Sequence, residues 1–435
     1  MALRWLVRPN SYYDSVKLMR VSETLAALPG VARAAAVMGT PLNLRLLADD
    51  GLLDATVQAT TDDLLISVVG DDEAVADAAL ARAEELLRAR PPEERLPTAP
   101  LRAIEQAVGQ AGSNFAVIAV PGPSAAVEAF AALRAGMHVF LFSDNVSLRD
   151  EARLKRLASE RGLLMMGPDC GTSIVDGVGL GFANRVRPGP VGIVGASGTG
   201  IQHVSCLLDL AGIGIAQALG TGGRDLSGAV RGSMTRRAIA MLAADDEVEL
   251  IAVVTKPASD SAMRLLHREL IRAGKPVIAC LLGEMPPSEG AVSYVTTITD
   301  AAQMVVERLG GDSSQWFGPA TVPADRIGRA NSGPVLGFFA GGTLCSEAGQ
   351  VLDRMGVPHR LLDLGGDEYT RGRAHPMIDG RLRASMVTEL ADRPRAAALL
   401  LDVVLGDLAH PDPAGALAPA IAALPAGLSA YVTLV

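Results

Sequence analysis

Residues 189–200 read Gly-Pro-Val-Gly-Ile-Val-Gly-Ala-Ser-Gly-Thr-Gly, and this stretch decides the fold because the chain contains it in two versions. Residues 333–344 repeat the pattern as Gly-Pro-Val-Leu-Gly-Phe-Phe-Ala-Gly-Gly-Thr-Leu. The same offset relates Ala211-Gly-Ile213 to Met355-Gly-Val357. Chance does not hold one offset across several landmarks, so the two segments are predicted to be copies of one β-α-β fold.

Alternating strands and helices extend outward from these copies. Apolar runs of strand length at 115–120, 137–142 and 163–166 are separated by helix-length segments. Uninterrupted apolar strands of this kind belong in parallel sheets that are covered on both faces. We therefore predict three Rossmann- or flavodoxin-like parallel-sheet domains, the last two forming the internal duplication: residues 101–186, 189–310 and 333–435.

The N-terminal segment 1–90 has a different rhythm and predicts a small α+β domain with a ferredoxin-like order of elements. Pro-rich or polar segments at 91–100 and 311–332 are predicted to be linkers. The last domain has no counterpart of 292–309, so we expect it to be shortened by one strand and one helix. The predicted fold class is α/β, with the small α+β domain in front of the three parallel-sheet modules.

The composition favours closely packed helix-on-sheet layers and excludes several classes of function. Aromatic residues make up 3% of the 435 residues, and the net charge is −9. A nucleic-acid partner requires clustered Lys and Arg, so none is expected. No apolar run reaches the ~18 residues of a membrane span, and the N-terminus does not resemble a signal peptide. We expect a soluble, cytoplasmic protein with no membrane partner.

The four cysteines are widely spaced and lie in or beside apolar runs: Cys170, Cys206, Cys280 and Cys345. No CxxC motif or Cys/His cluster occurs, so we expect neither a metal site nor a disulfide framework.

The two Gly-rich turns are candidate anion sites. Each follows an apolar strand and opens a helix, whose first backbone amides have no partner within the helix and whose dipole favours an anion. The alternative is a tight strand-to-helix connection without a ligand, but the repetition of a Thr in both turns favours binding. The predicted phosphate-binding residues of the turns are Ser197, Gly198, Thr199, Gly200, Gly341, Gly342 and Thr343.

Further candidates follow other strands, where ligands bind in open α/β sheets. Gly222, Gly223 and Arg224 are predicted to bind substrate or phosphate, and Gly365-Gly366 is their counterpart in the second copy. The predicted catalytic residues are Lys256, His375, Asp402 and His410, and Arg373 is predicted to bind substrate or phosphate. The histidines could donate to phosphate or transfer protons, and Asp402 could orient one of them. The alternative for each is a structural role in its loop.

Several motifs spread over nearly the whole chain carry a family resemblance: Ser11-Tyr-Tyr-Asp-Ser-Val-Lys-Leu-Met19, Met166-Gly-Pro-Asp-Cys-Gly-Thr172, Gly220-Thr-Gly-Gly-Arg-Asp225, Val254-Thr-Lys-Pro257, His375-Pro-Met-Ile-Asp379 and Leu401-Asp-Val-Val-Leu-Gly406. With them the chain resembles the FdrA family, which is similar to succinyl-CoA synthetase. The resemblance implies that 115–310 matches the α subunit of that enzyme and 333–435 the C-terminal domain of its β subunit. In the synthetase, two helix N-termini face each other across a phosphate site, and Ser197–Gly200 and Gly341–Thr343 would be those termini.

The chain departs from the synthetases in three features. The loop 283–290, which corresponds to the one that carries their phosphorylated His, contains no His. No ATP-grasp nucleotide domain is present, and the glycine motif that binds coenzyme A at the start of the first domain is missing. Some FdrA-family proteins resemble subunits of oxamate carbamoyltransferase, and that chemistry requires phosphate positioning without a phosphohistidine.

The predicted function is therefore that of one subunit of a phosphate-dependent carbamoyl or acyl transferase. It would interconvert a ureide such as oxalurate plus phosphate with carbamoyl phosphate plus an amide, together with partner subunits. The substrate would be phosphate or carbamoyl phosphate, without a further cofactor. One alternative is a subunit of an acyl-CoA synthetase that uses coenzyme A and ATP with an ATP-grasp partner. Another is a non-catalytic scaffold of a multi-subunit enzyme.

Overall fold

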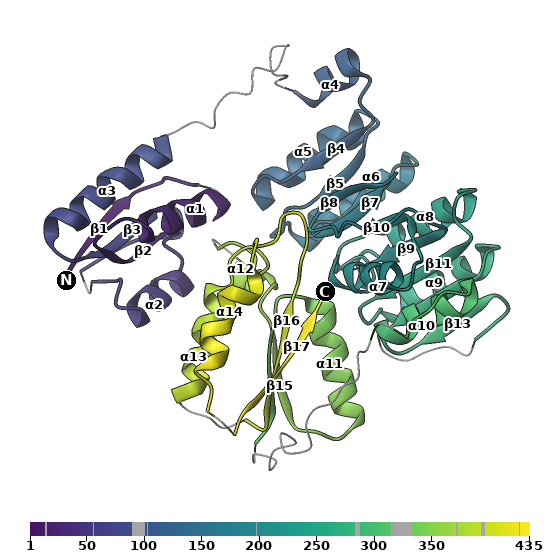
Figure 1. Ribbon diagram of the computed structural model, residues 1–435. Coiled ribbons are helices and arrows are strands. Elements are labelled where there is room, and N and C mark those ends of the chain that lie inside the picture. Colours follow the sequence, from purple (N-terminus) through teal and green to yellow (C-terminus); the bar gives the residue numbers. More distant parts are fainter. Residues whose placement is uncertain are drawn as a thin grey trace. The chain divides into compact units, whose positions relative to one another are not determined.

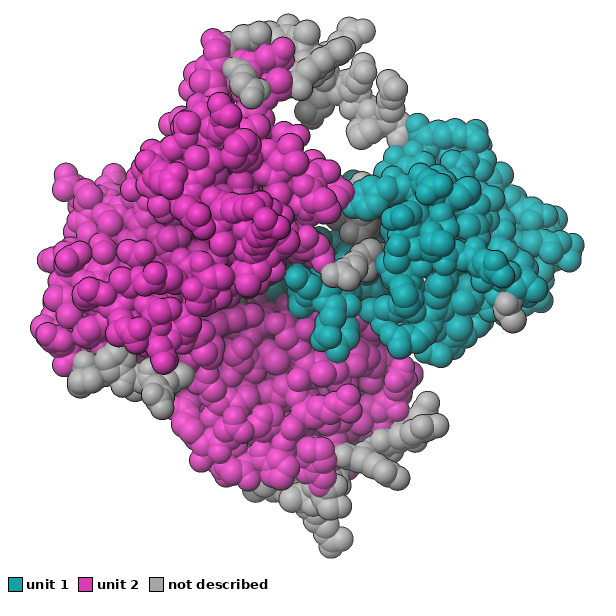
Figure 2. Space-filling model, turned by 180° about the vertical axis from the view of Figure 1, so that it is seen from behind, with its two compact units in different colours: residues 1–100, 365–379 teal, residues 101–364, 380–435 magenta. Residues whose placement is uncertain are grey.

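The computed structural model describes residues 1–13, 15–54, 56–88, 101, 103–196, 198–282, 288–314, 316, 333–370, 373–392, 396–425 and 427–435 (Figure 1). Internal contacts divide the chain into two units, which Figure 2 shows in two colours: Met1–Pro100 with Gly365–Asp379, and Leu101–Leu364 with Gly380–Val435. The predicted linker 91–100 and most of the linker 311–332 lie outside the described residues. Within the described part of the chain, no helix is long and apolar enough to cross a bilayer.

The N-terminal part of the first unit is a three-stranded antiparallel sheet with helices on both faces, which confirms the predicted α+β domain. Leu25 of α1 and Ala79 of α3 are buried against Ile66 on one face of the sheet. Leu47 of α2 packs beside Leu65 on the other face. The strands, in the order β1-β3-β2, and the helices are β1 (Ala2–Arg8), β2 (Val31–Met38), β3 (Leu64–Gly70), α1 (Ser15–Ala26), α2 (Pro41–Asp49) and α3 (Glu73–Arg88).

Segment Gly365–Asp379, which carries the short helix α12 (Asp367–Thr370), belongs to this first unit. Its Arg373 donates from Nε to Oδ1 of Asn43 in α2, at 3.2 Å. The loop after one strand of the third predicted domain is therefore grouped with the N-terminal domain rather than with its own sheet.

The second unit begins with a parallel sheet of three strands in the order β4-β5-β6. Val139 and Phe140 on the central strand are buried, and Ala129 of α5 and Leu154 of α6 belong to the same core. The elements are α4 (Ile104–Ala111), β4 (Phe115–Ile118), α5 (Gly122–Arg134), β5 (His138–Leu141), α6 (Leu148–Glu160) and β6 (Met165–Met166).

The second sheet has seven strands in the order β13-β12-β11-β9-β10-β7-β8. Strands β9 to β13 are parallel and buried, as continuous apolar runs predict. The hairpin β7-β8 joins the edge of this sheet antiparallel to β10, so the predicted domain 101–186 contributes strands to two sheets. The strands are β7 (Thr172–Val175), β8 (Val178–Gly181), β9 (Val191–Gly195), β10 (Ile215–Gly220), β11 (Leu250–Thr255), β12 (Val277–Leu281) and β13 (Val292–Val295). The helices are α7 (Gly198–Leu210), α8 (Ser233–Ala244), α9 (Asp260–Arg272) and α10 (Ile298–Leu309).

The third sheet repeats the second. Its parallel order β15-β14-β16-β17 reproduces β10-β9-β11-β12, and this confirms the internal duplication. The elements are β14 (Val335–Phe339), α11 (Gly342–Arg354), β15 (His359–Asp363), α13 (Arg381–Asp392), β16 (Ala398–Val403), α14 (Pro413–Ala422) and β17 (Ser429–Leu434).

The second and third sheets are joined through the helices that follow β9 and β14, which contact each other in the second unit. Gln202 of α7 donates from Nε2 to the carbonyl of Leu405 at 3.0 Å. On the other side, Glu347 of α11 accepts from the backbone amide of Ile298 at 2.5 Å. The first contact joins α7 to the loop after β16, and the second joins α11 to the start of α10, so each helix of the duplication is bonded to the other copy.

Candidate functional site

The starts of α7 and α11 touch each other reciprocally. A methyl group added at Gly341 would lie 2.6 Å from Cγ2 of Thr199, and one added at Gly200 would lie 3.3 Å from Cγ2 of Thr343. Thr199 and Thr343 are 2% and 0% exposed. The structure therefore brings the two predicted Gly-rich turns together without an intervening apolar layer. Of the predicted residues, Ser197 lies outside the described part of the chain.

Among the described residues, three threonines on these sheets and helices have a buried hydroxyl without a hydrogen-bond partner. Oγ1 of Thr343, in the first turn of α11, is buried and has no hydrogen-bond partner among the described residues. The same holds, within the described chain, for Oγ1 of Thr172 and of Thr255. Oγ1 of Thr172 lies 3.0 Å from the position of a methyl group added at Gly198. Sequence reasoning missed Thr172 because its strand belongs to a hairpin that only the folded chain brings to α7.

A lysine and a carboxylate lie at the start of α11. Nζ of Lys256 is 3.7 Å from Oδ2 of Asp363, and both side chains are about one third exposed, at 31% and 33%. A methyl group added at Gly342 would lie 2.2 Å from Oδ2 of Asp363 and 2.6 Å from Nζ of Lys256. Because Gly342 has no side chain, Asp363 and Lys256 can lie against the backbone there. Lys256, which was predicted, is therefore close to the start of α11. Asp363 was not predicted.

Asp402 holds the turn in front of α11. Its two carboxylate oxygens accept from the backbone amides of Ala340 and Gly341, each at 2.7 Å. Arg383 donates from Nη1 to Oδ1 and to the backbone oxygen of Asp402, again at 2.7 Å each. Both side chains are buried. The prediction that Asp402 orients a histidine is thus corrected: its partners are two amides and an arginine.

The predicted histidines lie in local turns. Nδ1 of His410 accepts from the amide of Asp412 at 3.0 Å, and Nδ1 of His375 accepts from the amide of Met377 at 3.3 Å. His375 and Arg373 belong to the first unit, whereas the paired helix starts belong to the second. These contacts give the three residues partners in their own surroundings, and their catalytic or phosphate-binding roles stay predictions.

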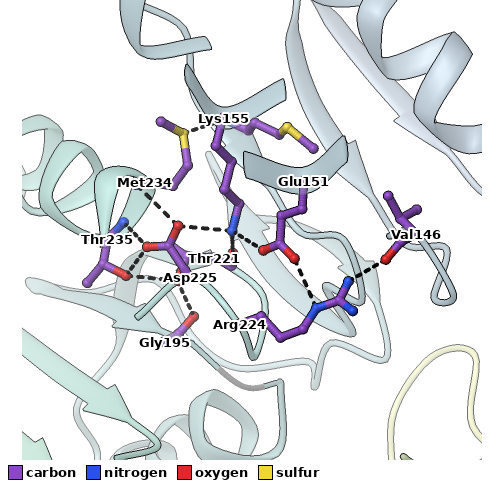
Figure 3. A network of polar contacts seen from close by, with 10 residues as sticks. Val146, Glu151, Lys155, Gly195, Thr221, Arg224, Asp225, Met234 and Thr235 are labelled. Carbon is purple, nitrogen blue, oxygen red and sulfur yellow. Dashed lines mark hydrogen bonds and ion pairs between the residues drawn. The ribbon is translucent and has the colours of Figure 1, made fainter. Parts of the chain in front are cut away.

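The loop Gly222–Asp225 is fixed by a buried ionic network (Figure 3). Nζ of Lys155 contacts Oε1 of Glu151 at 2.8 Å, Oδ1 of Asp225 at 2.9 Å and the carbonyl of Thr221 at 2.8 Å. Glu151, Lys155 and Asp225 are fully buried. The network therefore joins α6, which packs on the sheet β4-β5-β6, to the loop that follows β10.

Arg224 is part of this network, and its predicted role as a phosphate ligand stays a prediction. It donates from Nε to Oε2 of Glu151 at 2.9 Å and from Nη2 to the carbonyl of Val146 at 2.8 Å (Figure 3). These contacts direct it toward α6 and its preceding loop. Gly223, by contrast, lies near the site, because a methyl group added there would be 4.0 Å from Nζ of Lys256.

Comparison with known proteins places the chain in a family. A family model described as the AllF heavy metal-associated domain matches residues 1–100, and a CoA-ligase model matches residues 338–434. YahF of Escherichia coli strain K12, an uncharacterized protein, is 38% identical over 447 residues, which cover 95% of this chain and 86% of YahF. The chain belongs to the YahF family. The segment that matches the heavy metal-associated domain contains no cysteine.

Several relatives of this YahF-family chain are named for an activity, and these are subunits of CoA ligases. The mitochondrial ADP-forming succinate–CoA ligase subunit alpha-2 of Trichomonas vaginalis is 26% identical over 212 residues, covering 47% of this chain and 67% of that subunit. The corresponding alpha 2 subunit of Archaeoglobus fulgidus is 29% identical, covering 45% and 68%. An ATP citrate lyase structure from Methanothrix soehngenii aligns with a TM-score of 0.39 and 18% identity, covering half of this chain and 42% of the lyase chain. By the family model over 338–434 and the two succinate–CoA ligase subunits, the chain is related to enzymes of the CoA-ligase kind.

The adjacent residues Gly222 and Gly223 allow a matched test of the loop. Gly222 has φ +84°, and a methyl group there would lie 2.4 Å from the carbonyl oxygen of Pro168, whereas the nearest atom to one at Gly223 is 3.8 Å away. We expect Gly222→Ala to lower the free energy of unfolding by about 2 kcal/mol or more and Gly223→Ala by under about 1 kcal/mol. Urea unfolding measures both; equal losses would contradict the described loop conformation.

The buried network predicts a large effect for Lys155. Lys155→Met leaves the buried carboxylate of Asp225 without a cation and that of Glu151 with Arg224 alone, and this should lower the free energy of unfolding by roughly 3–5 kcal/mol. Arg153 on the same helix pairs with Asp150 at 3.9 Å and is exposed, so Arg153→Met should cost no more than about 0.5 kcal/mol. Denaturant unfolding of the two variants makes the comparison. A small loss for Lys155→Met would show that the network is not assembled as described.

Proposed function

We propose that this chain is a subunit of a phosphate-dependent acyl transferase related to the CoA ligases, and that phosphate or an acyl phosphate binds at the paired starts of α7 and α11. One observation carries the proposal: the reciprocal contacts of Thr199 with Gly341 and of Thr343 with Gly200. They bring together two helix N-termini that come from different copies of one fold.

The electrostatics of this arrangement favour an anion. Each helix start has the equivalent of roughly half a positive charge, together with amides that no residue of the same helix can accept from. Lys256 adds a cation beside Gly342, and Asp363 is the carboxylate nearest to it. The unpartnered hydroxyl of Thr343 offers a further donor. A phosphate dianion would satisfy these groups together.

The site residues support group transfer by direct attack of phosphate. A phosphate oxygen would bond to the carbonyl carbon of the donor, the bond from that carbon to the leaving nitrogen would break, and the nitrogen would take up a proton. Donors held at the helix starts would position phosphate and stabilise the oxyanion of the tetrahedral intermediate. With a ureide donor the products are carbamoyl phosphate and an amide.

The sequence of loop 283–290 favours this reaction over one through a phosphohistidine, because the loop contains no His. The likeness to ADP-forming succinate–CoA ligase subunits favours the second candidate, an acyl-CoA synthetase that works with a nucleotide-binding partner. Both candidates use the same phosphate site. They differ in whether the chain carries a covalent phosphoryl group.

Substitutions at the helix starts test phosphate binding. Thr343→Val removes one hydrogen bond to a charged group, worth about 1.5–3 kcal/mol, and should weaken phosphate binding roughly 10- to 100-fold. Lys256→Met should weaken it at least as much. Thr388→Val is the control, because its exposed hydroxyl donates only to the carbonyl of Ala384 in its own helix. Equilibrium dialysis with labelled inorganic phosphate measures the three variants; unchanged binding in Thr343→Val and Lys256→Met would refute the site.

A second experiment separates the two reactions. The purified protein with its partner subunits is given carbamoyl phosphate and an amide such as oxamate, and the release of inorganic phosphate is followed. The same preparation is incubated with γ-labelled ATP. We expect phosphate release that depends on the amide and no labelled protein. Labelled protein together with formation of an acyl-CoA thioester would instead support the synthetase.

A further inference from the structure

The two copies of the fold hold their Gly-rich turns in different ways. In the first copy, the amide of Ala196 donates to the backbone carbonyl of Val254 at 3.1 Å. At the equivalent position of the second copy, the amide of Ala340 donates to the carboxylate of Asp402, and the next amide, of Gly341, donates to its second oxygen. In the second copy, a charged side chain thus accepts the hydrogen bond that the backbone of a strand accepts in the first copy.

A carboxylate at this position conflicts with an anion site. Asp402 is 0% exposed and bonds the residue directly before α11, within one turn of the amides that would bind phosphate. An unpaired buried carboxylate would repel a phosphate dianion bound at those amides, because like charges interact strongly where water is excluded. The carboxylate therefore requires a counter-charge that does not itself occupy the site.

Arg383 supplies this counter-charge from behind the turn. It lies in the first turn of α13, it is 2% exposed, and it contacts both the carboxylate and the backbone oxygen of Asp402. Burial raises the pKa of Asp402, while Arg383 and the two amides act in the opposite direction. The other titratable groups nearby are Cys345 of α11, whose pKa is raised to about 12 by burial, and the pair of Lys256 and Asp363.

We propose that Arg383 is a positioning residue of the phosphate site: it neutralises Asp402, so that the carboxylate can hold the turn before α11 without repelling the bound anion. This inference rests on the proposed function, because it assigns a role in phosphate binding. It goes beyond that function because it assigns a role in phosphate binding to a residue that does not contact the phosphate.

Removal of Arg383 should give the affinity for phosphate an additional dependence on pH that the wild-type protein lacks. Without the cation, the pKa of Asp402 rises further. At low pH the carboxyl group is then neutral and the site keeps most of its affinity. As the pH rises, the unpaired carboxylate forms and repels phosphate. The ionisation of phosphate itself affects all variants equally, so it cancels in the ratio of the dissociation constant of a variant to that of the wild type.

The experiment measures this ratio between pH 5 and pH 8 for the full chain by equilibrium dialysis with inorganic phosphate. For Arg383→Met we expect the ratio to rise about tenfold or more across the range. It should stay flat for Arg383→Lys, which keeps the cation, and for the double variant Asp402→Asn/Arg383→Met, which has no charge to neutralise. Arg354→Met, at the opposite end of α11, is the control. A flat ratio for Arg383→Met, or an equal rise in the double variant, would overturn the inference.

A second readout does not involve phosphate. In Arg383→Met the folded protein binds a proton on Asp402 that the unfolded chain has already released, so the free energy of unfolding should fall as the pH rises above about 4. The double variant should lack this fall. If the wild type binds no phosphate, the proposed function fails, while this comparison still decides whether Arg383 neutralises Asp402. A fall of the same size in both variants would refute the neutralisation.

Discussion

The close approach of two helix N-termini is the constraint on which the second unit depends. Both ends carry partial positive charge, so without a compensating group they repel each other. Glycine makes the approach possible, because any side chain at Gly341 would collide with Thr199. The contact therefore has steric specificity but unfavourable electrostatics. An anion bound between the two helix ends would turn this repulsion into attraction. Two helix ends held together are therefore stronger evidence for an anion site than a single Gly-rich turn.

The duplication explains both the similarity of the two turns and the differences between them. Equivalent strand orders present equivalent helix starts, and the two starts lie against each other at Thr199 and Gly341 and at Thr343 and Gly200. The surroundings have diverged: Lys256 follows β11, whereas Asp402 lies within β16. One copy thus contributes the partly buried cation Lys256, and the other contributes the buried carboxylate with its arginine. The site belongs to neither copy alone, and only the assembled second unit contains it.

The sequence predicts the fold better than the site. The constant offset between the repeats predicts the duplicated sheets, and it predicts that Thr199 and Thr343 occupy equivalent positions. It does not predict partners that are distant in sequence, such as Lys155 with Asp225 or Arg383 with Asp402. Arg224 and Asp402 were good candidates by residue type and position, but each forms an ion pair with a buried residue of the protein. A charged residue at the end of a strand is more available to substrate when no buried residue of opposite charge pairs with it. The local sequence does not show whether such a partner is present.

The relation to CoA ligases and the sequence of loop 283–290 lead to different expectations about covalent chemistry. A phosphohistidine enzyme needs two things: a place that stabilises a phosphoryl group and a nucleophile that carries it. In the proposed site, the paired helix starts would provide the first without any contribution from a histidine. A lineage that lost the nucleophile could therefore keep the anion site and use it for phosphate as a direct reactant. The buried groups that shape the turn, Asp402 and Arg383, would be retained in either case, because they act on the binding of the anion and not on its covalent transfer.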